Sequence, residues 1–275
     1  MAARRAARGW MLLATALMVA AHGAGAGDLP VRRVVTTNLC ADRLALELTD
    51  RKNVVSVSRF AADPAVSTVA AAAAGIPVNQ GNAEDIVALH PDLVVMGAFN
   101  SHLAAAMLRS LGLKVHVLPL AESIGQARAA IRGVAAELGV PEQGERMVAG
   151  MDARLAALPV RGRPIRAAVY QAGGWSAGSG TMADDLFGRI GFANLAAEAG
   201  IVGFGALPLE TLVASSPELI VLESMGDGPP SVAGELLRHP TLSRNIAKVS
   251  VPMRLWACPD PALVDAAALI AGAAP

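Results

Sequence analysis

Short aliphatic runs separated by segments of helical period constrain the fold of this chain more than any other feature. The runs predict strands at 31–37, 54–57, 93–96, 115–118, 165–171, 219–222 and within 248–256. They lack alternating polar residues, which is typical of strands covered on both faces of a parallel sheet. The intervening segments predict helices at 41–48, 64–74, 84–88, 101–111, 181–190, 209–214, 232–237 and 261–271. This alternation predicts an α/β fold with mostly parallel central sheets.

The stretch between the two halves of the chain is helical and has no strand pattern. A helix is expected over 123–138, where Gly139 ends it, and Pro141 suits the first turn of a second helix. We therefore predict a single long linking α-helix within 141–160. It would join an N-terminal lobe at 27–140 to a C-terminal lobe at 161–275.

The first 26 residues have the pattern of a cleavable signal peptide. Arg4, Arg5 and Arg8 form a basic start, 10–21 is an apolar run, and 24–26 supplies small residues for cleavage. The apolar run is shorter than the roughly 20 residues that span a bilayer, which disfavours the alternative of an uncleaved anchor. We expect segment 1–26 to be removed on export.

Composition excludes several classes of protein. The chain is 53% hydrophobic and 17% charged, which excludes a disordered protein. Lys+Arg and Asp+Glu both number 23, so no basic surplus favours nucleic acid. With three Trp, one Tyr and five Phe, the chain also offers little for stacking on unpaired bases.

An internal repeat supports two similar halves. Segment 84–95 matches segment 210–221: each has a glutamate, a short helix, a Pro-acid turn and a buried strand. Two copies of one supersecondary unit indicate duplicated lobes better than one continuous sheet.

Together, the signal peptide, the strand leading into 38–42, the linking helix and the repeat resemble a known family. They are similar to the periplasmic ligand-binding proteins of ABC importers, in the subgroup that captures ferric siderophores and vitamin B12. The resemblance covers about 31–271. It implies two lobes with a ligand cleft between them, a periplasmic location, an importer permease as partner, a monomer, and neither cofactor nor catalysis.

In that family the glutamate that opens the repeated unit meets arginines of the permease, and Glu84 and Glu210 are the matching positions here. Two carboxylates on a rigid body can recognise a symmetric pair of cations. The alternative is that each glutamate only favours a helix N-terminus, which contributes about 0.3–1 kcal/mol.

A ligand site is expected beyond the carboxyl ends of the parallel strands. The large or polar side chains in those loops are the candidates: Arg59, Phe60, Gln80, Asn100, Trp175, Phe204, Met225 and Trp256. They suit a planar or amphipathic metal chelate, with a ferric siderophore preferred over a corrinoid. The alternatives are that Arg59 is a surface charge and that Phe204 or Trp256 is a core residue. A further alternative is that Tyr170 ligates haem iron.

Cys40 and Cys258 fall in predicted cleft loops of opposite lobes. A disulfide across the cleft, a soft-metal thiolate pair and two isolated buried thiols all remain open, because sequence gives no Cα–Cα distance.

Two rival motifs are weaker. The pattern from Gly174 to Gly178 matches a nucleophile elbow around Ser176, with Asp227 and His239 following in hydrolase order. The next helix is expected only at Thr181, so the loop is too long for an elbow, and we predict no catalytic residue. The histidines are scattered, so no bare metal site is predicted.

Overall fold

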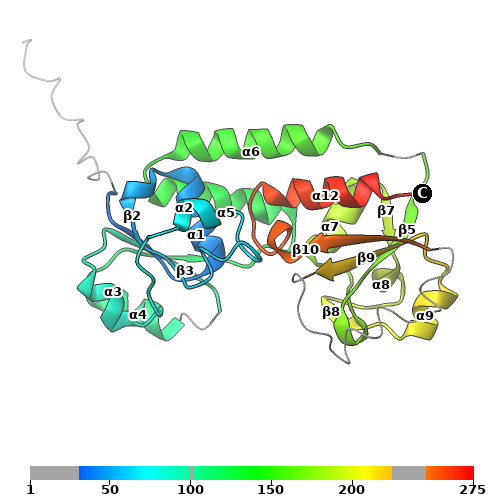
Figure 1. Ribbon diagram of the computed structural model, residues 1–275, viewed down its shortest axis with the longest axis horizontal. Helices are drawn as coiled ribbons and strands as arrows, with labels where there is room; N and C mark the ends of the chain where they lie inside the picture. Colours follow the sequence, from blue (N-terminus) through cyan, green and yellow to red (C-terminus); the bar gives the residue numbers. More distant parts are fainter. Residues whose placement is uncertain (1–30, 100–101, 161, 225–245) are drawn as a thin grey trace, which may run out of the picture. The chain divides into compact units, whose positions relative to one another are not determined.

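Two four-stranded parallel sheets organise the chain (Figure 1). The computed structural model describes residues 31–99, 102–160, 162–224 and 246–275. The first sheet has the order β2-β1-β3-β4, with β1 Val34–Thr36, β2 Val54–Ser56, β3 Leu93–Gly97 and β4 Val115–Leu118. The second has the order β10-β9-β5-β7, with β5 Ile165–Tyr170, β7 Phe192–Asn194, β9 Leu219–Ser224 and β10 Ala247–Pro252. The predicted α/β class with mostly parallel sheets is confirmed.

Helices alternate with these strands, and five of the described helices begin at the side-chain caps that sequence favours. Asn38, Asn82, Ser123, Thr181 and Asn194 each accept a hydrogen bond from a backbone N–H in the first turn of the following helix. The helices are α1 Leu39–Leu48, α2 Ala70–Ala73, α3 Ala83–Ala88, α4 His102–Ser110, α5 Ile124–Glu137, α6 Pro141–Ala156, α7 Met182–Arg189, α8 Leu195–Glu198, α9 Leu209–Ala214 and α12 Ala262–Gly272.

Alternate strand residues enter different cores, because successive side chains point to opposite faces of a sheet. In β1, Val34 joins a large cluster that includes α1, α5, α6 and α12, whereas Val35 joins a smaller cluster under α3 and α4. In β5, Val169 faces the large cluster and Tyr170 faces a third cluster with α8 and α9. One continuous core therefore covers the inner faces of both sheets.

Helix α6 is a single helix of 16 residues with Pro141 in its first turn. It packs beside α5 and α12 (Figure 1). Its Val148 and Met151 are buried in the large core, and a Cβ at Gly144 would lie only 2.5 Å from Ala135 Cβ, so α5 and α6 approach closely there. Residues 31–275 form one compact unit, and the lobe boundaries at 140 and 161 stay a prediction.

The internal repeat of the sequence is also a repeat in the structure. In both copies, α3 to β3 and α9 to β9, the residue before the proline has a positive φ: His90 at 46° and Ser216 at 51°. The acid after the proline then accepts backbone N–H groups, Asp92 from Arg33 and Glu218 from Arg166. Because local geometry and partners recur, the two units are equivalent turns.

Some predicted elements are wrong. The helix expected over 64–74 is reduced to α2, because Asp63 and Ser67 accept local backbone hydrogen bonds and form separate turns before it. A two-stranded antiparallel sheet of β6 Trp175–Ala177 and β8 Phe204–Ala206 was not predicted, and β7 and α8 were also missed. The helix predicted at 232–237 lies outside the described residues.

Candidate functional site

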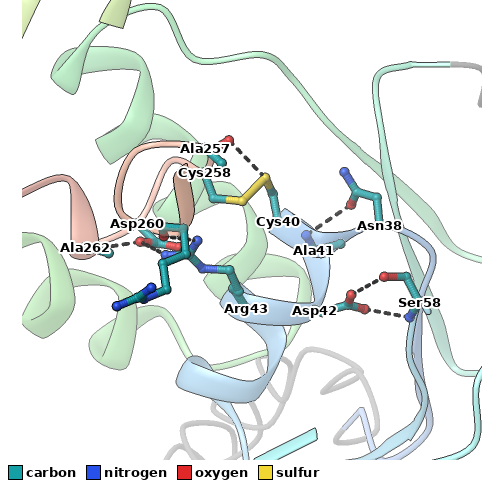
Figure 2. Close-up of a disulfide and its surroundings, with 11 residues drawn as sticks. Asn38, Cys40, Ala41, Asp42, Arg43, Ser58, Ala257, Cys258, Asp260 and Ala262 are labelled. Carbon is teal, nitrogen blue, oxygen red and sulfur yellow. Dashed lines mark hydrogen bonds and ion pairs between the residues drawn. A yellow bond between two sulfur atoms is a disulfide. The ribbon is translucent and has the colours of Figure 1, made fainter. Parts of the chain in front are cut away.

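Helix α1 places a disulfide and a buried ion pair side by side (Figure 2). Cys40, in the first turn of α1, is bonded to Cys258, with an Sγ–Sγ distance of 2.11 Å and a Cα–Cα distance of 5.1 Å. Of the three states that the sequence left open, the structure contains the disulfide. It links the segment after β1 of the first sheet to the segment after β10 of the second.

One helical turn after Cys40, Arg43 reaches the same C-terminal segment. Its Nη2 donates to Asp260 Oδ1 at 2.7 Å, its Nε lies 2.7 Å from Oδ2, and its Nη1 donates to the Arg254 carbonyl oxygen. Both side chains are fully buried. Burial and the nearby charge of Asp260 raise the pKa of Glu47, on the next turn of α1, to about 7. The positive charge of Arg43 opposes that rise in the pKa of Glu47.

Asp42, on another face of α1, anchors the loop after β2. Its carboxylate accepts hydrogen bonds from the Thr36 and Ser58 hydroxyls and from the Ser58 backbone N–H (Figure 2 draws the Ser58 bonds). Burial raises the pKa of Asp42, and these donors oppose that rise. The loop that carries Arg59 and Phe60 is thus fixed at its first residue.

A pocket of about 260 Å³ lies against the disulfide, and we call it the disulfide pocket. Cys40, Cys258 and Trp256 line it together with mostly apolar residues. The remaining lining residues are Asn38, Gly97, Ala98, Phe99, Leu118, Pro119, Leu120, Ala121, Met182, Ala257 and Pro259. Because the lining combines loops after β1, β3 and β4 with the segment after β10, both sheets contribute to one pocket.

A second pocket of about 90 Å³ shares Met182 and Trp256 with the first, and we call it the Glu223 pocket. Its other lining residues are Val169, Gln171, Ala177, Ala183, Phe204 and Glu223. Gln171 Nε2 donates to Glu223 Oε2 at 2.6 Å. Burial raises the pKa of Glu223, and the hydrogen bond from Gln171 opposes that rise. The two pockets together are called the crevice below.

The β6–β8 sheet carries aromatic side chains beside the crevice. Phe204 lines the Glu223 pocket, and Trp175, half exposed, lies on the paired strand. A Cβ at Gly178 would lie 2.0 Å from the Ile201 carbonyl oxygen, so only glycine lets the chain approach this closely after β6.

The structure brings together only part of the predicted ligand set. Trp256, Phe204 and the two cysteines line the crevice, whereas Arg59, Phe60, Gln80 and Trp175 are exposed and line neither pocket. The Arg59 guanidinium carbon instead lies 4.6 Å from the centre of the Phe60 ring. Asn100 and Met225 lie outside the described residues.

Sequence reasoning missed Glu223, Gln171 and Met182. Glu223 follows four aliphatic residues of β9, and this acid at the carboxyl end of a buried run was the available signal. The strand predicted at 219–222 ended just before Glu223, and the loop expected after it began at Ser224. Gln171 was missed in the same way, because it was assigned to the strand.

The two predicted docking glutamates occupy equivalent places on α3 and α9. Glu84 and Glu210 are exposed in the first turns of these helices. Ile86 anchors α3 among Val35 and Val94, and Leu212 anchors α9 among Ala168 and Ile220. Each carboxylate is therefore held on the surface of its own sheet's outer layer.

The residues of the rival motifs form neither a catalytic nor a metal site in the part of the chain that the structure describes. Ser176 is fully buried in β6, and its hydroxyl donates to the Val169 carbonyl oxygen, so it is not a nucleophile on a turn. The predicted partners Asp227 and His239 lie outside the described residues. Tyr170 is buried in the α8–α9 cluster and lines neither crevice pocket. Within the described residues, no group of three or more His, Cys, Asp or Glu side chains is placed to hold a metal.

The sequence profile of the family described as "Periplasmic binding protein" matches residues 34–247, which include the first sheet and strands β5, β7 and β9 of the second. The chain belongs to this family. This periplasmic binding protein is therefore a solute-binding protein and not an enzyme. Among the helices of the described residues, none combines the length and apolar character that crossing a membrane requires.

Solved structures share the fold of this periplasmic binding protein. The apo periplasmic heme-binding protein RhuT from Roseiflexus sp. RS-1 is 24% identical, with a TM-score of 0.69 over 88% of this chain and 97% of that one. An ABC-type Fe3+-hydroxamate transport system protein from Saccharomonospora viridis is 21% identical (TM-score 0.67; 89% and 93% covered). The vitamin B12 binding protein BtuF of Vibrio cholerae is 17% identical (0.63; 88% and 96%). No curated protein sequence matches the chain.

Proposed function

We propose that this periplasmic binding protein captures a ferric siderophore-type chelate and delivers it to the permease of an ABC importer. Segment 1–26 would direct its export and be removed. The observation that carries the proposal is the crevice, in which loops of both sheets enclose apolar and aromatic walls beside the disulfide. Walls of this kind suit a bulky chelate with an apolar periphery. A corrinoid or a haem is the alternative cargo, since proteins that bind them share the fold.

The cargo can be identified on protein purified from its own periplasm. We expect a ferric chelate to co-purify, with its mass given by mass spectrometry and a charge-transfer band in the blue-violet. A corrinoid or haem spectrum would favour the alternative cargo. A protein that carries none of these, and binds none when they are added, would contradict the proposal.

Ligand binding should quench Trp256 fluorescence. Removal of segment 1–26 leaves Trp175 and Trp256 as the tryptophans of the chain, so each single Trp→Phe variant keeps one reporter. We expect strong quenching by the chelate in Trp175→Phe, because Trp256 lines both pockets. Quenching should be weaker in Trp256→Phe, whose remaining Trp175 lines neither. The reverse order would place the ligand on the β6–β8 sheet instead.

Delivery should depend on the two exposed glutamates. We expect Glu84→Lys and Glu210→Lys together to lower uptake at least about tenfold, because reversal turns attraction to the permease into repulsion. The affinity for the chelate, measured by fluorescence, should stay unchanged. Glu142→Lys is the matched control, since Glu142 is also an exposed glutamate in the first turn of a helix. Loss of chelate affinity in the double variant would refute the docking assignment.

A further inference from the structure

The crevice holds one carboxylate in otherwise uncharged surroundings. Glu223 ends the aliphatic run of β9 and is partly buried against Val169, Phe204 and Trp256. Among the described residues that line the two pockets, Glu223 is the sole ionisable side chain. Arginine and lysine are absent from this described lining. An anionic group that entered the crevice would therefore meet a negative charge and no cation from the described lining.

Neighbouring backbone contacts fix the direction of the Glu223 carboxylate. The Gln171 backbone N–H donates to the Trp175 carbonyl oxygen at 2.8 Å, and the Gln171 carbonyl oxygen accepts from the Gly174 N–H. Gln171 is thereby held where its amide donates to Oε2 of Glu223. A carboxylate oxygen accepts more than one hydrogen bond, so the group retains capacity for a donor supplied by a ligand.

A hydrogen-bond donor on the ligand would offset the desolvation cost of the partly buried Glu223 carboxylate. Burial among apolar side chains disfavours a charged carboxylate, and this burial raises the pKa of Glu223. An ammonium or an amide N–H placed against Glu223 would offset that desolvation, and a hydrogen bond to a charged group is stronger than a neutral one. A ligand carboxylate would add like-charge repulsion in the same partly buried place.

We propose that Glu223 is the polar anchor of the crevice and selects chelates that present a cationic or N–H donor group over anionic chelates. The inference rests on the proposed function, because it names the charge class of the same cargo. It predicts that a chelate's peripheral charge, independently of its metal core, sets its affinity.

Three ferric trihydroxamates with one core and different terminal charge test this selection. Ferrioxamine B ends in an ammonium, its N-acetyl derivative is neutral, and its N-succinyl derivative ends in a carboxylate. Dissociation constants come from Trp fluorescence of the processed, disulfide-bonded protein. We expect the ammonium form to bind at least about tenfold more tightly than the succinyl form, with the acetyl form between them.

The variant Glu223→Gln keeps the shape of the side chain and removes its charge. We expect it to bind the three chelates within about threefold of one another, while Glu142→Gln, on α6 and outside the crevice lining, keeps the wild-type order. Thermal unfolding of each variant checks that the fold is intact. The comparison of the three chelates on the wild-type protein does not depend on whether any variant folds.

Equal affinity for the three chelates, tighter binding of the succinyl form, or an unchanged preference in Glu223→Gln would overturn the inference and leave the proposed function standing. If only a corrinoid quenches, the same comparison is made between cyanocobalamin, whose side chains end in amides, and its monocarboxylic acid. The amide form should then bind more tightly. Absence of quenching by every hydroxamate, by the corrinoid and by haem contradicts the proposed function itself.

Discussion

Replacement of Cys40 and Cys258 together by alanine should lower the free energy of unfolding by about 5 kcal/mol. The two cysteines are 218 residues apart in the sequence, so loss of the bond returns a large loop-closure entropy to the unfolded chain. Urea denaturation followed by circular dichroism gives the value, with the wild-type protein measured in the same buffer without reductant.

A reducing agent provides the control for this change. It should destabilise the wild-type protein by a similar amount and leave the double-alanine variant unaffected. A loss below about 1 kcal/mol would contradict the prediction. It would mean that residual structure already restricts the unfolded chain without the crosslink.

Asp260→Asn should cost about 3–5 kcal/mol, because it leaves the Arg43 guanidinium buried without its counter-charge. The carboxylate also accepts the Ala262 backbone N–H at the start of α12, and that bond is weakened. The midpoint of urea unfolding should fall without a change in slope.

Asp265→Asn is the matched control for that variant. Asp265 also pairs with an arginine, Arg154, but both side chains are about half exposed. An exposed pair contributes about 0–1 kcal/mol, so Asp265→Asn should change the free energy of unfolding very little. If Asp260→Asn lowered the free energy of unfolding equally little, water or another acceptor would have to satisfy the Arg43 guanidinium. Joint replacement of Arg43 by Met and Asp260 by Leu should cost less than Asp260→Asn alone.

The regular part of the fold could be predicted from sequence because its signals are local. Short runs rich in aliphatic residues predicted seven of the strands, and the helix expected from Thr181 begins at Met182 with Thr181 as its cap. The repeat at 84–95 and 210–221 also predicted the equivalent turns, since the same residue types impose the same backbone. The exception at 64–74 has alanine-rich helical propensity, but Asp63 and Ser67 form local turns that compete with the helix.

The site was harder because it depends on distant parts of the chain. Strands β6 and β8 have three residues each, and their pairing joins segments about thirty residues apart, which no local pattern reveals. The rule on strand ends selected the loop of Arg59 correctly as a loop, but it does not say which way a side chain points. Trp256 lines both pockets although it lies four residues after the end of β10, and its role as a ligand contact stays a prediction.

The cysteines show the same limit. Position in predicted loops could bring Cys40 and Cys258 to one region, but only the geometry of α1 and the segment after β10 gives a Cα–Cα distance of 5.1 Å. Arg43, three residues after Cys40, carried no signal of its own. Its partner Asp260 lies 217 residues away.

The link between α1 and the segment after β10 has a consequence for how the protein matures. A chain that enters an oxidising compartment from its N-terminus exposes Cys40 long before Cys258 follows. During that interval Cys40 is an unpaired thiol, open to mixed disulfides with oxidants or with other nascent chains. On the export route proposed above, correct oxidation is a late event in translocation, and a product truncated before Cys258 would carry an unpaired thiol as its signature.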